Sequence, residues 1–511
     1  MEALLNHEAP PSPVDGSNSG RMKPQYRDII KHSGVYGLGQ VLARLASVLL
    51  LPLYTHYLTP ADYGCIAILD LTAGVMAILI GSGMVAAANR YHFDSDDPRA
   101  QDLVWWTGLA VVTATATALV VPAILARDVL AYITLGRQEP AGAYFYALVL
   151  PTLWFATISQ VPDRYLRVRK WSWASVAISS GQLLLNIALN VYFLTVMHLG
   201  VAGVLWGNLI TGVTATAVRC AILAWACWPF GIQWGLAGHM WRFGAPMVVT
   251  ALLATAMHQA DRYLLRLFVG LDQIGVYSLA YTIGQGVNAL CLAPFSAIWA
   301  VVMYEIAQQP EAKQIYARVF EHFVYALLLT LLGVSLVVTP LLAVFVSPEY
   351  IAAGPLVPIV CLGFVFFSLH EHFSVPAYVA KKTVGFVFVY AAAAVANIVF
   401  TLFLVPVMGV AGAAWASVVG YAVFSGVGLM RYRQIDRFEY PLARCGIVLL
   451  AMVASYVGCQ FIATLRAGLA WRFGTSSLVW TVWAVTLLYP IVKKQLSMRS
   501  FTAAAVARIA E

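Results

Sequence analysis

Long apolar runs constrain this chain more than any other feature of its sequence. A helix needs about 20 apolar residues to cross roughly 30 Å of hydrocarbon, and fourteen runs reach this length. They lie at 33–57, 63–88, 103–126, 141–162, 173–197, 201–228, 243–268, 273–302, 320–342, 354–380, 384–406, 409–430, 442–464 and 476–492. Because barrel strands alternate in polarity and these runs do not, the sequence predicts an all-α integral membrane protein.

The composition supports this class. Hydrophobic residues make up 61% of the chain and charged residues only 11%, against about a quarter in soluble domains. The segments between the runs are too short for a soluble catalytic domain, and no Gly-x-x-x-x-Gly-Lys-Ser/Thr motif is present. The sequence therefore disfavours an ATP-driven pump.

The loops predict an orientation. Membrane proteins keep lysine and arginine in their cytoplasmic loops, so these residues should alternate from loop to loop. One set of loops and both ends hold Arg21, Lys23, Arg27, Lys31, Arg90, Arg99, Arg164, Arg167, Arg169, Lys170, Arg219, Arg242, Lys313, Arg318, Lys381, Lys382, Arg431, Arg433, Arg437, Arg444, Lys493, Lys494, Arg499 and Arg508. The other set holds Arg127, Arg137, Arg466 and Arg472. We therefore expect a multi-pass membrane protein with both termini cytoplasmic. The net charge of +8 is then a topology signal and does not indicate nucleic-acid binding.

An internal repeat relates the two halves of the chain. The segment "NIALNVYFLTVMHLGVAGVLW" (186–206) aligns with "NIVFTLFLVPVMGVAGAAW" (397–415), and Gly64 falls on Gly275 in the same register. Six predicted helices separate equivalent positions, so both copies have the same orientation, as in transporters with parallel repeats around a shared site. The predicted regions are a disordered polar tail (1–30), two six-helix bundles (31–230 and 239–435), helices 13 and 14 (440–495) and a second tail (496–511).

Several motifs resemble a known family. The segments "LPLYTHYLTPADYG" (51–64), "ADRYLL" (260–265) and "IGVYSLAY" (274–281), with the paired "GVAG" seams, are similar to the polysaccharide-transport branch of the MOP superfamily. That branch contains the Wzx-type flippases for undecaprenyl-pyrophosphate-linked glycan repeat units. Over residues 30–495 the resemblance implies two bundles around a cationic cavity with alternating access. It also implies that the last two helices lie outside the bundles, where a lipid tail could run.

Few ionisable residues interrupt the apolar runs, and those that do are candidate functional groups because they are costly in a membrane. The arginines are Arg44, Arg262 and Arg266, and the acids are Asp70, Asp261 and Glu371. His258, Asp261, Arg262 and Arg266 share one helical stripe, so we expect them to face one place. Gln40 and Arg44 share a similar stripe on the first helix. The charges do not repeat, since Arg44 aligns with Thr255 and Asp70 with Tyr281, which favours one asymmetric ligand.

Guanidinium groups suit a pyrophosphate because their planar fork binds phosphate oxygens. We expect Arg44 and Arg262 to bind it, Asp261 to orient Arg262, and Arg266 to attract the head group, with Gln40 and His258 nearby. Alternatively, Asp261 and Arg262 only pin helix packing and Arg266 reaches toward the membrane surface. Asp70 and Glu371 either carry a proton or Na⁺ or are partners of the arginines.

Three other functions remain open at this stage. A MATE-type small-molecule antiporter shares the fold, although a cavity with unpaired arginines would repel cationic substrates. A MurJ-type lipid II flippase differs only in substrate. A membrane-embedded glycan polymerase or acyltransferase is supported only by His370, Glu371 and His372. We expect no cofactor and no metal, and as partners the lipid-linked glycan, membrane lipids and other polysaccharide-export components, with no nucleic acid.

Overall fold

The computed structural model describes residues 50–136, 139–382, 384–465, 471, 473–487 and 489. Within these ranges the regular structure is helical and contains no strand. Twelve of the helices are long and apolar enough to cross a membrane, and a shorter apolar helix covers Phe473–Leu487. The predicted all-α membrane class is confirmed. The first predicted run lies outside the described residues up to residue 49, and residues 50–57 are helical.

The helices follow the chain in a simple order. Their bounds are α2 (Pro60–Tyr91), α3 (Pro98–Leu125), α4 (Arg127–Thr134), α5 (Gly142–Val168), α6 (Ser172–Val191), α7 (Gly200–Ala226), α8 (Trp234–Leu265), α9 (Leu271–Ile306), α10 (Ala312–Phe345), α11 (Leu356–Phe373), α12 (Val375–Val379), α13 (Gly385–Met408), α14 (Val410–Tyr432) and α15 (Leu442–Leu465). A π-helical turn, η1 (Tyr192–Val196), follows α6, and a 3₁₀ turn, η2 (Pro348–Ala353), precedes α11. The short elements α4 and η2 were not predicted from the sequence.

Local chemistry fixes where α2 and α3 begin. The Thr59 hydroxyl accepts from the backbone N–H of Asp62 at 3.2 Å, and the Asp62 carboxylate accepts from the backbone N–H of Thr59 at 2.9 Å. This reciprocal capping satisfies two of the N–H groups that a helix start leaves free. At α3, the Asp97 carboxylate accepts from the backbone N–H groups of Arg99 and Ala100. In both helices a proline follows the cap, where its missing N–H costs nothing.

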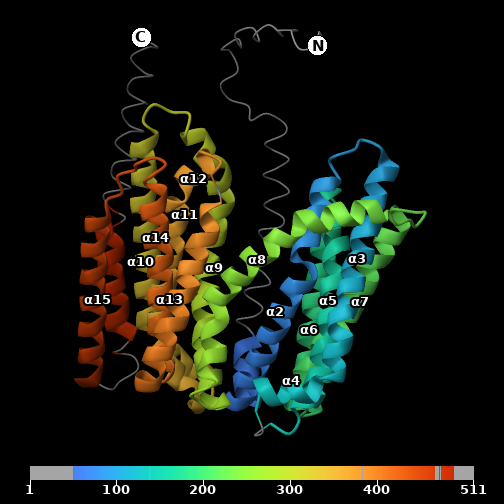
Figure 1. The fold of residues 1–511 in the computed structure, drawn as a ribbon. Coiled ribbons are helices and arrows are strands. Elements are labelled where there is room, and N and C mark those ends of the chain that lie inside the picture. The colour runs from blue at the N-terminus through green and yellow to red at the C-terminus, as the bar shows by residue number, and fades with distance from the viewer. Residues whose placement is uncertain are drawn as a thin grey trace, which may run out of the picture.

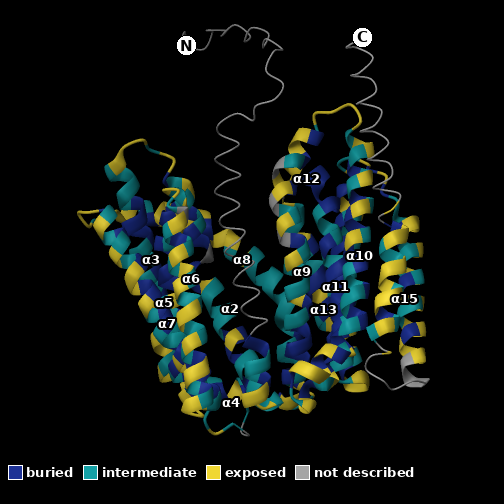
Figure 2. Ribbon diagram, turned by 180° about the vertical axis from the view of Figure 1, so that it is seen from behind, coloured by how far each residue is buried: buried dark blue, intermediate teal, exposed yellow. Residues whose placement is uncertain are grey.

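The helices form two groups that stand side by side in Figure 1. The first bundle contains α2, α3, α5, α6 and α7, and the second contains α9, α10, α11, α13 and α14, with α15 packed against α10. Helix α8 crosses from one group to the other, since it packs against both α2 and α13. Pro246 lies inside α8, and a proline bends a helix by removing one hydrogen bond. Figure 2 shows buried residues inside both groups.

The predicted repeat is visible in the backbone. Lys170 (φ 58°) and Lys381 (φ 57°), 211 residues apart, both adopt left-handed conformations just after a helix. Gly200 (φ 56°) and Gly409 (φ 59°), one from each "GVAG" segment, adopt the same conformation at the starts of α7 and α14. These paired conformations recur at equivalent positions of the two halves, as the repeat in the sequence predicts.

The two bundles meet at one end of the molecule. The end where Arg90, Arg99 and Lys313 flank the loops is called the basic side, and its loops are 92–97, 227–233 and 307–311. The bundles meet at the other end, called the opposite side, whose connections are 58–59, 266–270 and 346–355. On the opposite side the repeat-related Gly64 and Gly275 touch. A Cβ on Gly64 would lie 2.0 Å from the Leu271 carbonyl oxygen, and a Cβ on Gly275 would lie 1.8 Å from that of Pro60. In Figure 1 the ribbons diverge from this lower end upward.

Candidate functional site

Arg262 is a membrane-embedded cation without a salt bridge in the described part of the chain. It lies three residues before the end of α8, and its guanidinium carbon is 4.2 Å from the ring centroid of Tyr281 on α9. Its buried Nε makes no hydrogen bond. The face of an aromatic ring attracts a cation but does not neutralise its charge. Arg262 therefore retains capacity for an anion.

Asp70 contributes the facing charge from the first bundle. Its side chain is exposed although it lies well inside α2. It lines a cavity of about 220 Å³ with residues of α2, α5 and α7, among them Gly74, Thr152 and Asn208. Asp70 and Arg262 are close enough for their charges to interact, yet no salt bridge joins them. An anion-binding group and a cation-binding group thus lie near each other at the seam between the bundles.

Asp261 does not hold the guanidinium of Arg262 as the sequence suggested. Only 1% of Asp261 is exposed, and its carboxylate accepts hydrogen bonds from the hydroxyls of Tyr277 and Ser417, the latter at 3.0 Å. It also accepts from the backbone N–H of Arg262 at 2.8 Å. The physical reason is that α9 and α14 bring hydroxyl donors next to the Asp261 carboxylate, while the Arg262 guanidinium lies over the ring of Tyr281.

Of the four residues of the α8 stripe, Arg266 departs from the expectation that all face one place. The other three lie around the tyrosines of the second bundle: Arg262 covers the ring of Tyr281, whose hydroxyl donates to the His258 carbonyl at 2.8 Å, and Asp261 accepts from Tyr277. His258 Nδ1 lies 2.6 Å from the hydroxyl of Tyr421, inside the second bundle. Arg266 points to the other bundle and donates from Nη2 to the Leu135 carbonyl at 2.6 Å. Residues of one stripe share a helix face at their Cα atoms, but the direction of each side chain depends on the residues that it contacts.

The other predicted residues within the described ranges lie near the end of α11. Gln40 and Arg44 lie outside the described residues. Glu371 is near the basic end of α11, where its carbonyl accepts from Trp299 Nε1 at 3.4 Å. His370 stacks on Phe424 with ring centroids 4.0 Å apart, and His372 packs between rings that include Trp299 at 4.8 Å. The three neighbours in sequence thus contact different partners.

One buried cation was assigned wrongly from the sequence. Arg219 was counted among the loop residues, but it lies inside α7 and is 7% exposed. Its guanidinium donates to the Ser159 hydroxyl at 3.0 Å and to the Ser179 hydroxyl at 3.1 Å, and its Nε lies 3.7 Å from Asp163. Helices α5 and α6 supply these acceptors, which lets the bundle bury the charge. The position of Arg219 several residues inside an apolar run indicates that it belongs to the helix and not to the loop.

The repeat also places equivalent polar pairs in the two bundles. In the first, Asn186 Nδ2 donates to Asn208 Oδ1 at 2.9 Å. In the second, the aligned Asn397 donates to the aligned Ser417 hydroxyl at 3.3 Å. Asn208 lines the Asp70 cavity, whereas Ser417 binds Asp261. The repeat in the sequence aligns Asn186 with Asn397, but it does not predict the hydrogen bond that each asparagine makes to the following helix.

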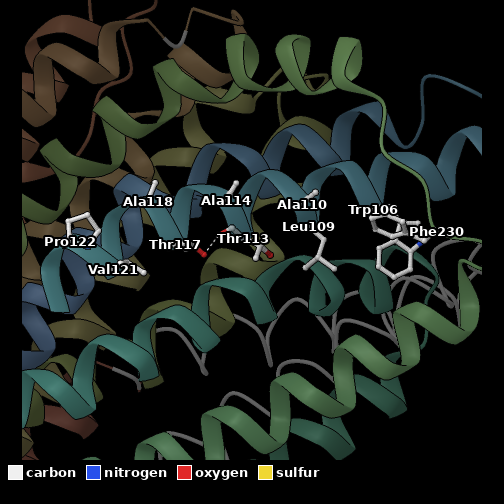
Figure 3. A pocket seen from close by; sticks show the side chains of 10 residues that line it. All are labelled: Trp106, Leu109, Ala110, Thr113, Ala114, Thr117, Ala118, Val121, Pro122 and Phe230. Atoms are coloured by element: carbon white, nitrogen blue, oxygen red, sulfur yellow. Dashed lines mark hydrogen bonds between the residues drawn. The ribbon is translucent and has the colours of Figure 1, made fainter. Parts of the chain in front are cut away.

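Two apolar hollows lie away from these charges. One, of about 780 Å³, runs along α3 from Trp106 and Phe230 to Pro122 (Figure 3). Its threonine hydroxyls include that of Thr117, which is hydrogen-bonded to the Thr113 carbonyl at 2.8 Å. The other, of about 190 Å³, lies between α15 and the helices α10, α11 and α14. Neither is lined by an ionisable carboxylate, lysine, arginine or histidine, so each suits a hydrocarbon chain better than a polar head group.

Comparison with known proteins identifies the fold. The sequence profile of the family described as "Polysaccharide biosynthesis protein" matches residues 29–303. The structure resembles "Lipid II flippase MurJ, inward closed conformation" with a TM-score of 0.71 at 12% identity, covering 91% of this chain and 100% of that one. It also resembles an inward-facing "multidrug resistance MATE family transporter of the MOP superfamily" (0.64, 14% identity, 78% and 98% covered). No curated protein matches significantly by sequence.

Proposed function

Because the chain belongs to the polysaccharide biosynthesis protein family and has the fold of MOP superfamily flippases, we propose that it flips an undecaprenyl-pyrophosphate-linked oligosaccharide across the bacterial cytoplasmic membrane. The substrate would be a repeat unit of O-antigen or exopolysaccharide. The basic side faces the cytoplasm with both termini, in keeping with the distribution of lysine and arginine between loops. The chain acts as a transporter and not as an enzyme.

The guanidinium of Arg262, which makes no salt bridge within the described residues, carries this proposal. A cation within a membrane protein is costly unless it faces an anion, water or a cavity. In the described part of the chain the neighbours of Arg262 include the ring of Tyr281 and the carboxylates of Asp70 and Asp261, and neither carboxylate forms a salt bridge with it. A pyrophosphate supplies the missing negative charge and can accept two parallel hydrogen bonds from one guanidinium. Arg44, which lies outside the described residues, is the second cation that the sequence predicts for the same group.

The position of Arg262 supports alternating access. It projects from α8, the helix that packs against both bundles, beside a seam that is closed on the opposite side by Gly64 and Gly275. A head group bound there enters from the basic side, and the bundles then rock about the site to release it on the other.

Asp70 is the coupling group in this proposal. Its carboxylate is exposed in a cavity, and when it is ionised it attracts the same guanidinium that the pyrophosphate requires. Binding of a proton or Na⁺ to Asp70 frees Arg262 for the substrate, so the two events are linked through charge. Glu371 is the alternative coupling group.

The lipid tail lies outside the bundles. The hollow between α15 and the second bundle is lined by apolar side chains such as Leu332, Leu362 and Met452 and opens at the surface of the bundle. An isoprenoid chain there remains in the hydrocarbon layer while its head group crosses through the protein.

Two alternatives differ in what they require. A MurJ-type lipid II flippase uses the same pyrophosphate chemistry, and the resemblance to the MurJ structure over 91% of the chain favours keeping it as the second candidate. A glycan polymerase or acyltransferase needs converging catalytic groups, and the side chains of His370 and His372 face different aromatic neighbours.

Complementation tests the proposal. Arg262→Ala protein at normal abundance should fail to restore surface glycan to a flippase-deficient strain, and Arg44→Ala should fail in the same way. Arg242→Ala is the matched control, because Arg242 lies on the same helix but is exposed at the basic end. Full restoration by both Arg262→Ala and Arg44→Ala would refute the assigned anion site.

A further inference from the structure

Helix α4 has an unusual position and an apolar outer face. It follows α3 directly at the opposite side, and in Figure 1 it lies at the lower end of the first bundle. Val129 and Ile133 of α4, spaced four residues apart, are 57% and 69% exposed, and Leu125, the last residue of α3, is 80% exposed. A short helix at the end of a membrane span, with its apolar residues turned outward, fits the boundary between head groups and acyl chains.

The inner face of α4 is attached to the first bundle. Ala131 and Leu135 are buried there. The Thr134 hydroxyl lies 2.7 Å from the hydroxyl of Tyr146 on α5. Tyr146 in turn donates to the Thr72 hydroxyl on α2 at 3.3 Å. Helix α4 therefore moves with α2 and α5.

A single arginine joins α4 to the other bundle. Arg266, at the end of α8, donates from Nη2 to the Leu135 carbonyl at 2.6 Å, where the end of α4 carries partial negative charge. Gly136 makes this approach feasible, since its φ of +78° favours glycine and a Cβ there would lie 2.6 Å from Arg266 Nη2. Tyr263, also on α8, donates to the Thr72 hydroxyl at 2.8 Å. These contacts bridge the bundles on the closed side.

We propose that α4 binds the lipid leaflet on the opposite side through Val129 and Ile133, and that Arg266 latches the second bundle to it. Lipid contact fixes the position of α4. The hydrogen bond from Arg266 to the Leu135 carbonyl, which we call the latch, then holds the seam between the bundles closed while the Arg262 site is open to the basic side. The role of the latch in transport rests on the proposed alternation of access, but closure of the seam is measurable without any substrate.

The native Cys65 reports whether the seam is open. It follows Gly64 in α2 and is 1% exposed. The other six cysteines, Cys220, Cys227, Cys291, Cys361, Cys445 and Cys459, are replaced by alanine. The protein in sealed vesicles is then treated with a membrane-impermeant maleimide from the opposite side. Arg266→Gln should increase the labelling rate at least about fivefold, as expected for the loss of one charge-assisted hydrogen bond.

Arg127→Gln is the matched control, because Arg127 is an exposed cation on α4 itself. It should leave the labelling rate unchanged. An unchanged rate in Arg266→Gln, or an equal increase in Arg127→Gln, would overturn the latch.

Gly136→Ala tests the same contact from the first bundle. The added Cβ displaces the guanidinium, so the labelling rate should rise as in Arg266→Gln. The double variant should label no faster than either single variant, because both break one contact. Independent increases that multiply in the double variant would contradict a shared latch.

The lipid contact has its own measurement. A fluorophore attached at Ile133→Cys in a cysteine-free background should be quenched by nitroxide-labelled phospholipid and protected from aqueous iodide. Val129→Asp should raise the labelling rate of Cys65 by weakening the lipid contact of α4. Quenching by iodide but not by the nitroxide lipid would show that α4 faces water and would overturn the proposed interface.

Discussion

The two bundles share a scaffold, but the carboxylates within their membrane-spanning helices have different surroundings. In the second bundle Asp261 is fully buried, and hydroxyls of Tyr277 and Ser417 bind its carboxylate. In the first bundle Asp70 is exposed in a cavity that it shares with Asn208, the residue aligned with Ser417. A carboxylate whose oxygens are already bound holds helices together, whereas one in an open cavity is free to bind a cation. We therefore propose a structural role for Asp261 and a coupling role for Asp70.

The largest expected effect comes from Asp261→Ala. It leaves the Tyr277 and Ser417 hydroxyls and the Arg262 N–H buried without an acceptor, so the free energy of unfolding should fall by about 3 kcal/mol. Unfolding of the purified protein in detergent measures it, and Asp261→Asn should lose less because it keeps one acceptor oxygen. A loss as small as that of Asp70→Asn would erase the distinction between the bundles.

The second effect concerns the point where the bundles meet. Gly275→Ala places a Cβ 1.8 Å from the Pro60 carbonyl oxygen, so the seam cannot close as it does here. Transport should fall at least about tenfold, which corresponds to a penalty near 1.4 kcal/mol on the closed state. Gly286→Ala, also on α9, is the control because nothing lies within 4 Å of its added Cβ. Equal transport by both variants would exclude a functional contact at Gly275.

A smaller effect is expected in the first bundle. Asn208→Ala removes the acceptor of the 2.9 Å hydrogen bond from Asn186, which still has its contact with Asn190. The free energy of unfolding should fall by about 1 kcal/mol, as for an ordinary buried hydrogen bond. A loss comparable to that of Asp261→Ala would mean that both bundles depend equally on their polar interiors.

The smallest effect on stability should come from Asp70→Asn. The exposed carboxylate makes no salt bridge within the described residues, so the free energy of unfolding should change by less than about 0.5 kcal/mol. Transport should nevertheless become insensitive to the coupling ion, as measured by substrate flipping in vesicles with and without a proton or Na⁺ gradient. A stability loss without a change in coupling would reverse the assignment.

Much of the fold could be predicted because hydropathy and repetition are long-range patterns. The apolar runs predicted twelve of the membrane helices, and the alignment of Gly64 with Gly275 pointed to residues that prove to touch. The prediction was weaker at helix ends, since α8 begins at Trp234, nine residues before the predicted start at 243. Its polar first turns lower the hydropathy without ending the helix.

The site was less predictable because side-chain direction depends on neighbours far apart in sequence. The charges on α8 were found, but which of them pair with Tyr277, Tyr281, Tyr421 or Leu135 depends on α9, α14 and α4. Arg219 was missed because its acceptors, Ser159 and Ser179, look like ordinary small residues in apolar runs. Sequence identifies which charges lie in the membrane, and only packing determines which of them stay free.

The most direct test is binding of a short-chain prenyl pyrophosphate to the purified protein. If Arg262 is the anion ligand, the affinity of Arg262→Ala should fall at least about tenfold, equivalent to one charge-assisted contact. Arg262→Lys should fall between Arg262→Ala and the unmodified protein, because lysine keeps the charge but not the fork. Arg242→Ala should bind normally. Unchanged affinity in Arg262→Ala would contradict the account of the site.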